Sequence, residues 1–275
     1  MRAKCRYGTS VKDNTFQNTK MRHVVVVTGA ANGIGEGLAR RYAADGATVY
    51  LADRDVERAQ AIAKEIGGKA IKCDVALEED VKRLVETVVR EAGRIDFFIS
   101  NAGIHLGGIG GDGLDRHTPA QWDRIWRVNV LSHVLCIQAL LPHFRRAGKG
   151  RFLVTASAAG LLSQIGDASY SVSKHAAVAI AEAVAIAHGD EGVTVHCLAP
   201  QGVLTNMNPG VGKDNPALAD GVLTVEQVAQ AVVDAVAAGT FLILPHPQVA
   251  KYVARKAQDY DKWLLGMRKW RRSML

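Results

Sequence analysis

Residues 23–35 read His-Val-Val-Val-Val-Thr-Gly-Ala-Ala-Asn-Gly-Ile-Gly. Four consecutive valines are typical of a buried strand, and the glycines after them permit a tight turn and a close approach of ligand to backbone. A helix that begins near Gly33 would point its free N–H groups and the positive end of its dipole at that turn. The stretch therefore predicts a strand, a phosphate-binding loop and a helix in direct succession.

An acidic residue follows the next expected strand, which covers residues 47–52. Asp53 lies eighteen residues beyond Gly35, where a carboxylate can accept hydrogen bonds from the ribose 2′-hydroxyl of NAD and would repel the 2′-phosphate of NADP. The intervening glycine-rich loop contains no Lys or Arg to offset that repulsion, which favours NAD. Arg54 is adjacent and leaves NADP open as the alternative, and capping of the next helix is the other interpretation of Asp53.

Short apolar runs and amphipathic segments alternate along the rest of the chain. Such alternation is typical of βαβ units, whose right-handed crossovers build a parallel sheet covered by helices. We therefore expect an α/β fold: a doubly wound, seven-stranded, mostly parallel sheet with helices on both faces, a Rossmann fold. The expected strands cover residues 23–28, 47–52, 69–73, 95–100, 151–156, 193–198 and 241–244, and the expected helices cover 33–45, a segment ending near 66, 78–92, a long segment from 118, 168–188, 224–238 and 248–271.

No linker or change of composition divides residues 21–247, so we expect one dinucleotide-binding domain there. Residues 1–20 lack apolar periodicity and are expected to form a disordered extension. Residues 248–275 are expected to form one basic helix, packed on the domain or at an interface, with Trp263 and Trp270 at helical spacing.

Composition excludes two other classes of protein. Hydrophobic residues make up 48% of the 275 residues and charged residues 22%, which excludes a largely disordered chain. The formal net charge is +7, but residues 1–22 carry +5 and residues 245–275 carry +6, so the body between them is acidic. A nucleic-acid-binding protein presents its basic charge as a patch on the folded body, and we expect no nucleic-acid partner.

The four cysteines and nine histidines show no metal-ligand spacing, and no metal site is expected. Cys73, Cys136 and Cys197 lie in apolar runs, where reduced thiols pack as small core side chains. Residues 1–22 lack the apolar segment of an export signal. The longest apolar stretch, 176–187, is shorter than the roughly 20 residues of a membrane span. We therefore expect a cytoplasmic protein without a membrane span.

Tyr170 and Lys174 are four residues apart in an expected helix and therefore share one face. A free phenol has a pKa of about 10, and a neighbouring ammonium would lower that pKa and favour proton exchange with an alcohol or carbonyl oxygen. Ser157, thirteen residues before Tyr170, could donate a hydrogen bond to the same oxygen. Tyr-x-x-x-Lys also occurs by chance, with a packed tyrosine and a solvated lysine, so the pair is specific only together with the phosphate loop and Asp53.

In this order the motifs resemble those of the short-chain dehydrogenase/reductase family, in its compact single-domain form, over residues 22–247. The resemblance implies a catalytic domain in which Tyr170 handles the proton of the substrate oxygen and Ser157 orients that oxygen. It implies that Lys174 binds the cofactor ribose and lowers the tyrosine pKa, and that Asn129 completes a water-linked proton relay.

The resemblance also implies a cofactor site, including an adenine contact at Asp74 and a cofactor wall at residues 101–103. Two positions depart from the family pattern: Ser100 replaces the first asparagine of Asn-Asn-Ala-Gly, and Gln201 replaces the glycine of Pro-Gly-x-Val-x-Thr, which leaves the local backbone path open. The expected cofactor residues are Gly29, Asn32, Gly33, Ile34, Gly35, Asp53, Arg54, Asp74, Val75, Asn101, Ala102, Gly103, Tyr170, Lys174, Pro200, Val203 and Thr205.

The implied reaction is the NAD-dependent interconversion of an alcohol and a ketone by hydride transfer. An NADP-dependent carbonyl reductase and a non-catalytic NAD-binding regulator are the alternatives. Residues 104–117, 158–166 and 204–223 are expected to choose the substrate, and their mostly apolar side chains favour a moderately hydrophobic secondary alcohol, although loop packing would explain the same residues. The helix expected over residues 168–188 is apolar on every side and must be covered on more than one, and with the resemblance this implies a homodimer or homotetramer.

Overall fold

Seven parallel strands form the centre of the molecule. The computed structural model describes residues 22–106, 114, 117–205 and 220–273. The strand order is β3-β2-β1-β4-β5-β6-β7, which confirms the doubly wound, seven-stranded α/β fold. Every pair of neighbouring strands in this sheet is parallel. The strands are β1 (Val24–Thr28), β2 (Thr48–Asp53), β3 (Lys69–Lys72), β4 (Phe97–Ser100), β5 (Gly150–Thr155), β6 (Val193–Leu198) and β7 (Leu242–Ile243).

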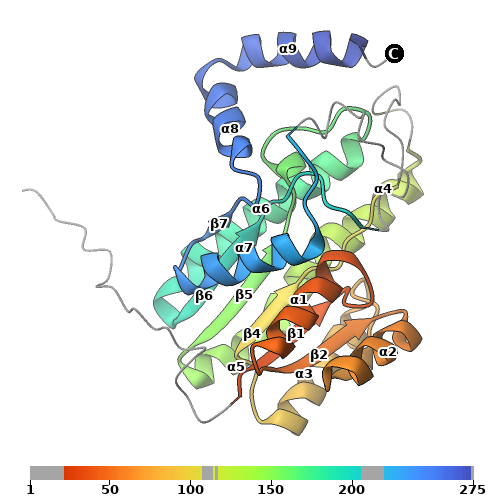
Figure 1. The fold of residues 1–275 in the computed structure, drawn as a ribbon, viewed down its shortest axis with the longest axis vertical. Helices are drawn as coiled ribbons and strands as arrows, with labels where there is room; N and C mark the ends of the chain where they lie inside the picture. The colour runs from red at the N-terminus through yellow and green to blue at the C-terminus, as the bar shows by residue number, and fades with distance from the viewer. Residues whose placement is uncertain (1–21, 107–113, 115–116, 206–219, 274–275) are drawn as a thin grey trace, which may run out of the picture.

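Helices cover both faces of this sheet (Figure 1). Successive side chains of a strand point to opposite faces, so Val24 and Val26 of β1 join one core cluster, whereas Val25 and Val27 join the other. The first cluster includes the buried side chains of α3 (Glu78–Ala92), α5 (Ser132–Ala147) and α6 (Ala168–His188). The second includes those of α1 (Gly33–Ala44), α2 (Val56–Ile66) and α7 (Val225–Ala237).

The strand order reverses between β1 and β4. From β1 the chain proceeds outward to β2 and β3 and then crosses to β4 on the opposite side. The loops after β1 and β4 consequently diverge at the carboxyl edge of the sheet, which is where open α/β sheets bind ligands. The fold therefore brings the phosphate loop, after β1, and residues 101–103, after β4, to this edge.

The long helix expected from residue 118 is interrupted. Thr118 and Gln121 form a capping box at the start of α4 (Pro119–Trp126), as Thr118-Pro119 predicts. A π-helical turn, Arg127–Leu131, then joins α4 to α5. Such a turn accommodates an extra residue in a helix and is frequent at functional sites, and this one contains Asn129.

The helical run Pro119–Ala147 is, among the described residues, the one long and apolar enough to cross a membrane. Length and composition alone are weak evidence, because core helices meet the same criteria. Within it, Cys136, Leu140 and Phe144 of α5 are buried in the core cluster against the sheet, and this packing accounts for the apolar character of the run.

The C-terminal segment forms two helices instead of the single expected one. α8 (Gln248–Gln258) and α9 (Tyr260–Ser273) are separated by Asp259, which has an extended backbone. Asp259 starts the second helix, because its carboxylate accepts the N–H of Lys262 at 2.9 Å. α8 buries Val249, whereas α9 has no fully buried residue and lies apart from the helices that cover the sheet (Figure 1).

Candidate active site

Close contacts require the glycines of the phosphate loop. A Cβ atom on Gly35 would lie 2.1 Å from the carbonyl oxygen of Gly29 and 2.6 Å from Nδ2 of Asn101. A Cβ atom on Gly29, whose φ is +65°, would lie 2.8 Å from the Cα atom of Ala102. Asn32 precedes α1 without a side-chain cap hydrogen bond, so the first-turn N–H groups remain available to a phosphate.

Asp53 ends β2 beside this loop and holds its backbone. Its Oδ2 accepts the N–H of Ala31 and its Oδ1 accepts the N–H of Asp55, each at 3.0 Å. Each carboxylate oxygen keeps a further lone pair with which it can accept a ribose hydroxyl. The cap of α2 comes from Asp55, which accepts the N–H of Arg58, and not from Asp53. Arg54 is exposed.

Asp74 and Val75 follow β3. The Asp74 carboxylate accepts the N–H of Ala76 at 3.0 Å, and the Asp74 N–H is donated to Asp80 at 2.9 Å. This backbone bond is the main reason that the pKa of Asp80 is lowered. Asp80 therefore positions Asp74, a role that only the three-dimensional contact reveals. Val75 packs its side chain in the core.

Asn101 ties β4 to the phosphate loop. Its Nδ2 donates to the carbonyl oxygen of Thr28 at 3.0 Å and to that of Gly29 at 3.4 Å. The Thr28 hydroxyl accepts the N–H groups of Asn101 and Ala102 at 3.0 and 3.2 Å. Thr28, absent from the expected site residues, thus joins the two strands at the point where their order reverses.

Asn129 is fully buried in the π-helical turn and fixes the chain that follows the cofactor wall. Its Oδ1 accepts the N–H of Ile104 at 2.8 Å, and its Nδ2 donates to the Ile104 carbonyl at 2.9 Å and to Ser173 at 3.1 Å. A Cβ atom on Gly103 would lie 3.3 Å from Lys174 Nζ. The small residue at 103 therefore leaves the space that the lysine needs beside Asn129.

Ser157, Tyr170 and Lys174 meet beyond the carboxyl end of β5. A hydrogen bond joins the side chains of Ser157 and Tyr170, and Ser157 also accepts the N–H of Ala159 at 3.1 Å. Lys174 Nζ donates to the carbonyl oxygen of Thr155 at 2.8 Å and lies 5.7 Å from the centre of the Tyr170 ring. The structure brings these three residues together as expected.

Burial dominates the ionisation of this group. It raises the pKa of Tyr170, and the hydrogen bond with Ser157 offsets part of that effect. Burial also lowers the pKa of Lys174 to about 8. The sequence predicted that Lys174 would lower the pKa of Tyr170, whereas in the structure this pKa is raised. The reason is that desolvation disfavours the charged phenolate. In the free protein the phenol is therefore protonated at neutral pH and can donate to a carbonyl oxygen.

The segment from Pro200 to Thr205 lies between the catalytic residues and the phosphate loop. The Pro200 carbonyl accepts a hydrogen bond from the Ser157 hydroxyl at 3.4 Å. The Thr205 methyl group lies 3.1 Å from the point where Gly33, whose φ is +54°, would carry a Cβ atom. Val203 is buried in the core. The segment thus touches both ends of the candidate site.

Gln201 stands where the family pattern has a glycine. Its backbone conformation is an ordinary one, because no described residue other than glycine has a positive φ. Its N–H donates to Nδ1 of His246 at 3.2 Å, and its side-chain Nε2 donates to Asp220 at 3.2 Å. Tyr252 of α8 donates to the other oxygen of Asp220 at 2.9 Å. Gln201 therefore connects the segment after β6 to the C-terminal helices.

The segments expected to choose the substrate are only partly described. Leu161 and Leu162 pack in a small cluster with Val249 of α8, and Lys256 donates to both of their carbonyl oxygens at 2.9 Å. Packing beneath α8 therefore accounts for these leucines. The parts that lie outside the described residues are 107–113, 115–116 and 206–219.

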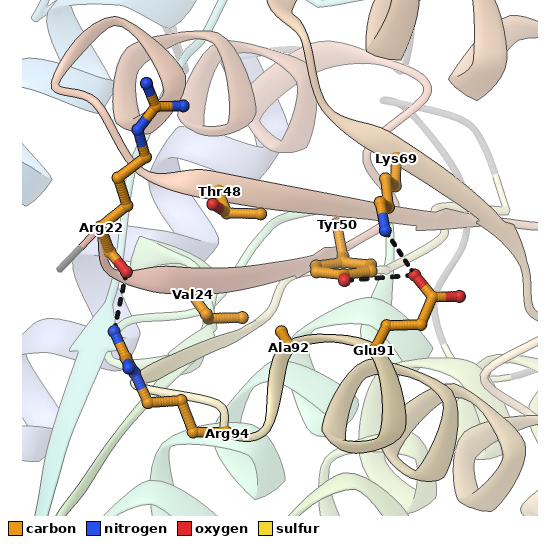
Figure 2. A pocket seen from close by; sticks show the side chains of 8 residues that line it. All are labelled: Arg22, Val24, Thr48, Tyr50, Lys69, Glu91, Ala92 and Arg94. Atoms are coloured by element: carbon orange, nitrogen blue, oxygen red, sulfur yellow. Dashed lines mark hydrogen bonds and ion pairs between the residues drawn. The ribbon is translucent and has the colours of Figure 1, made fainter.

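A cavity of about 350 Å³ lies at the opposite end of the sheet (Figure 2). Its walls include Val24, Thr48 and Lys69, the first residues of β1, β2 and β3. Glu91 also lines this cavity, and its carboxylate accepts hydrogen bonds from Lys69 at 2.7 Å and from Tyr50 at 3.3 Å. Because Ser157, Tyr170 and Lys174 meet beyond the carboxyl end of β5, this cavity is separate from the candidate site.

A family model described as short chain dehydrogenase matches residues 23–216. The chain belongs to this family. The membership confirms the resemblance read from the motifs, and the protein is a nicotinamide-dependent oxidoreductase that acts on alcohol or carbonyl groups.

Among its relatives, the meso-2,3-butanediol dehydrogenase of Serratia marcescens is 37% identical over 190 residues, which are 68% of this chain and 74% of the relative. A solved 3-ketoacyl-(acyl-carrier-protein) reductase of Brucella melitensis in complex with NADH has a TM-score of 0.74 and 30% identity, covering 81% of this chain and 95% of that one. An alcohol dehydrogenase of Thermococcus sibiricus, complexed with 5-hydroxy-NADP, has a TM-score of 0.71 and 27% identity, covering 82% and 96%.

The residues of this short-chain dehydrogenase fit a nicotinamide dinucleotide. The space kept free by Gly29 and Gly35 in front of α1 suits a pyrophosphate, and Asp53 suits an adenosine ribose. When bound, the cofactor supplies or accepts a hydride. Within the described part of the chain, no three His, Cys, Asp or Glu side chains are grouped so that they could hold a metal ion.

Proposed function

We propose that this short-chain dehydrogenase oxidises a secondary alcohol to a ketone with NAD, and catalyses the reverse reduction. The observation that carries the proposal is the hydrogen bond between buried Ser157 and half-buried Tyr170, beside buried Lys174. A substrate oxygen placed between the two hydroxyls would be oriented by Ser157 and would exchange its proton with Tyr170. The relative whose name specifies a butanediol substrate supports a secondary alcohol.

Asn129 and Lys174 would serve this proton exchange from behind Tyr170. The lysine is held by the Thr155 carbonyl, and Asn129 lies close by around Gly103. Because both groups are buried, a proton that leaves Tyr170 needs such polar groups to reach solvent. Each of the two is a positioning residue for the proton path and not a group that touches the reacting carbon.

NAD is the preferred cofactor of the proposal. The carboxylate of Asp53 lies next to the loop, where it would bind a ribose 2′-hydroxyl and repel a 2′-phosphate. Exposed Arg54 is the observation that favours the second candidate, an NADP-dependent reductase, because a guanidinium can pair with a phosphate. A related solved structure holds an NADP derivative.

A homo-oligomer is part of the proposal. α6 exposes five uncharged residues, Val172, Ala179, Ala183, Ile186 and Ala187, and Glu182 is the charged residue exposed beside them. Spacings of seven, four and three place the first four of them in one stripe along the helix, and small side chains in such a stripe allow close approach of a second helix. A second copy of the chain would cover this stripe.

The test of the reaction mixes purified protein with NAD⁺ or NADP⁺ and a panel of secondary, primary and alicyclic alcohols. Reduced nicotinamide is followed by its absorbance. Tyr170→Phe is expected to lower kcat by at least about 10²-fold, because it removes the acid–base group, while NAD affinity stays within about twofold. Full turnover in the variant, or no cofactor binding by the wild type, would refute the proposal.

A further inference from the structure

A polar group that the proposed mechanism does not use lies directly beside Tyr170. The imidazole of His105 meets the Tyr170 ring edge to face, with 5.2 Å between the ring centres. His105 is positioned by the catalytic site itself, because the preceding residue, Ile104, is held through both its backbone groups by Asn129. Its side chain is 11% exposed, so it lines the space in front of the tyrosine and is not a surface group.

Asp167 holds one nitrogen of this imidazole. Asp167 is fully buried, and its Oδ2 lies 3.1 Å from Nε2 of His105. Its other oxygen, Oδ1, caps α6 by accepting the N–H of Tyr170 at 2.8 Å and the hydroxyl of Ser169 at 2.9 Å. One carboxylate thus fixes the positions of the imidazole and of the helix turn that carries Tyr170.

Besides Tyr170, a second titratable group, His117, lies near the pair. It lies 3.9 Å from Asp167 Oδ1, and its Nδ1 bonds to Ser169 at 2.8 Å. Gln164 places its amide nitrogen 3.4 Å from Nε2 of His105. Asp167 and Gln164 thus both contact His105 through Nε2. Among the described residues, Nδ1 of His105 has no hydrogen-bond partner.

Two groups of opposite hydrogen-bonding character face Nε2 of His105. The Asp167 carboxylate can only accept a proton from Nε2, whereas the amide nitrogen of Gln164 can only donate one to it. Burial lowers the pKa of His105, Asp167 opposes the shift, and His117 adds to it. The neutral ring prevails at neutral pH, and in either tautomer Nδ1 is a donor or an acceptor that a hydroxyl group can satisfy.

We infer that Nδ1 of His105 forms a hydrogen bond with a second hydroxyl of the substrate, on the carbon next to the reacting one. The inference rests on the proposed function, because it places the reacting oxygen at Tyr170. The two oxygens of such a substrate are attached to carbons that are joined by a single bond, so the oxygens are close together. This short spacing suits a phenol and an imidazole whose rings are in contact. The substrate class is therefore vicinal diols and, in the reverse direction, α-hydroxyketones. Asp167 is the positioning residue.

The test compares two alcohols of nearly equal shape, 2,3-butanediol and 3-methyl-2-butanol, in which a methyl group replaces the second hydroxyl. Each stereoisomer is assayed separately with NAD⁺. The wild type is expected to favour the best diol by at least about tenfold in kcat/KM, because the alcohol without the second hydroxyl leaves the largely buried Nδ1 of His105 unpaired.

His105→Phe keeps an aromatic ring and removes both nitrogens, and it is expected to reduce the preference to about twofold or less. His105→Asn keeps a polar atom near the position of Nδ1 and is expected to restore part of the preference. Asp167→Asn retains a helix-capping side chain but removes the charge beside His105, and it is expected to raise KM for the diol more than it lowers kcat.

His188→Phe is the matched control. His188 forms the same kind of pair, with Glu191 at 3.0 Å, at the far end of α6, and its replacement is expected to leave the preference unchanged. Equal loss of both activities in His105→Phe would show that His105 only supports Tyr170 and would overturn the inference. A wild type without preference would also overturn it, whereas no turnover of any alcohol with either cofactor would refute the proposed function itself.

Discussion

At the scale of single residues, the polar atoms of the candidate site are held by backbone groups from distant parts of the chain. Asp53 accepts the N–H of Ala31, and Asn101 donates to the carbonyl oxygen of Thr28. Lys174 is held by the Thr155 carbonyl. Each side chain is thereby oriented before a ligand arrives, which reduces the ordering cost of binding.

Replacement of Asp53 tests the cofactor assignment. Asp53→Asn keeps one oxygen for the loop backbone and removes the charge, so NAD affinity is expected to fall about tenfold, the loss of roughly one charge-assisted hydrogen bond, while NADP affinity stays equal or rises. Fluorescence titration with NADH and NADPH measures both. Asp55→Asn is the control, because asparagine also caps a helix. Equal losses for both cofactors would remove Asp53 from ribose recognition.

Lys174 gives the free energy of unfolding a dependence on pH. Its pKa is about 8 in the folded protein against an ordinary value of 10.5. Between these values the unfolded chain binds more protons than the folded one, so the contribution of Lys174 to stability rises from about pH 8 to about pH 10.5 and is constant below this range. Urea unfolding of the wild type is expected to show this rise relative to Lys174→Met; parallel curves would contradict it.

At the scale of elements, two local departures from regular structure place functional groups. The π-helical turn Arg127–Leu131 lets Asn129 reach the backbone of Ile104. The uncapped start of α1 leaves N–H groups free behind a loop that has no room for side chains. Both features depend on backbone geometry. A small change of side chain at either place would therefore have a large effect on the position of the functional groups.

Gly35 tests the phosphate loop as an element. In Gly35→Ala the new methyl group would meet the carbonyl oxygen of Gly29 at 2.1 Å, so the loop must shift. We expect the free energy of unfolding to fall by about 1–3 kcal/mol and NAD affinity to fall at least tenfold. Gly189→Ala, where nothing lies within 4 Å, is the control. Calorimetry and NADH titration measure both, and normal affinity in Gly35→Ala would argue against the loop as the phosphate site.

At the scale of the whole molecule, the sheet faces are covered by helices, but α6 keeps one apolar stripe exposed. Ile186 is 84% exposed and Val172 is 44% exposed. Scattered apolar side chains are normal on a surface, but a row of apolar residues along one helix, bordered by the single exposed charge of Glu182, favours contact with another protein surface. The basic helices α8 and α9 and the carboxyl-terminal end of α6 lie at different ends of the molecule (Figure 1).

Ile186→Glu tests the proposed self-association. A charge within a helix–helix contact would be buried without a partner, so the variant is expected to sediment as a smaller species than the wild type at equal concentration. Ile186 is exposed in the single chain, and the unfolding temperature of the monomeric unit is expected to change little. An unchanged sedimentation coefficient would place the interface elsewhere.

The local signals of the sequence were sufficient for the fold and for the grouping of Ser157, Tyr170 and Lys174 in one candidate site. Valine runs, glycine spacing and amphipathic periods depend on neighbouring residues, so β1, α3 and α6 could be predicted closely. The motif order likewise predicted Ser157, Tyr170 and Lys174 as one site, and the structure brings them together.

Contacts between residues far apart in the chain were decided only by the tertiary structure. Asp80 behind Asp74, Thr28 beneath Asn101, and Asp167 beside His105 have no sequence signal, because their roles arise where separate elements meet. The opposite shift of the Tyr170 pKa has the same origin. A sequence shows which charged residues are neighbours, but the degree of desolvation depends on how the whole chain packs. At Tyr170 the effect of desolvation on the pKa outweighs the effect of the neighbouring Lys174.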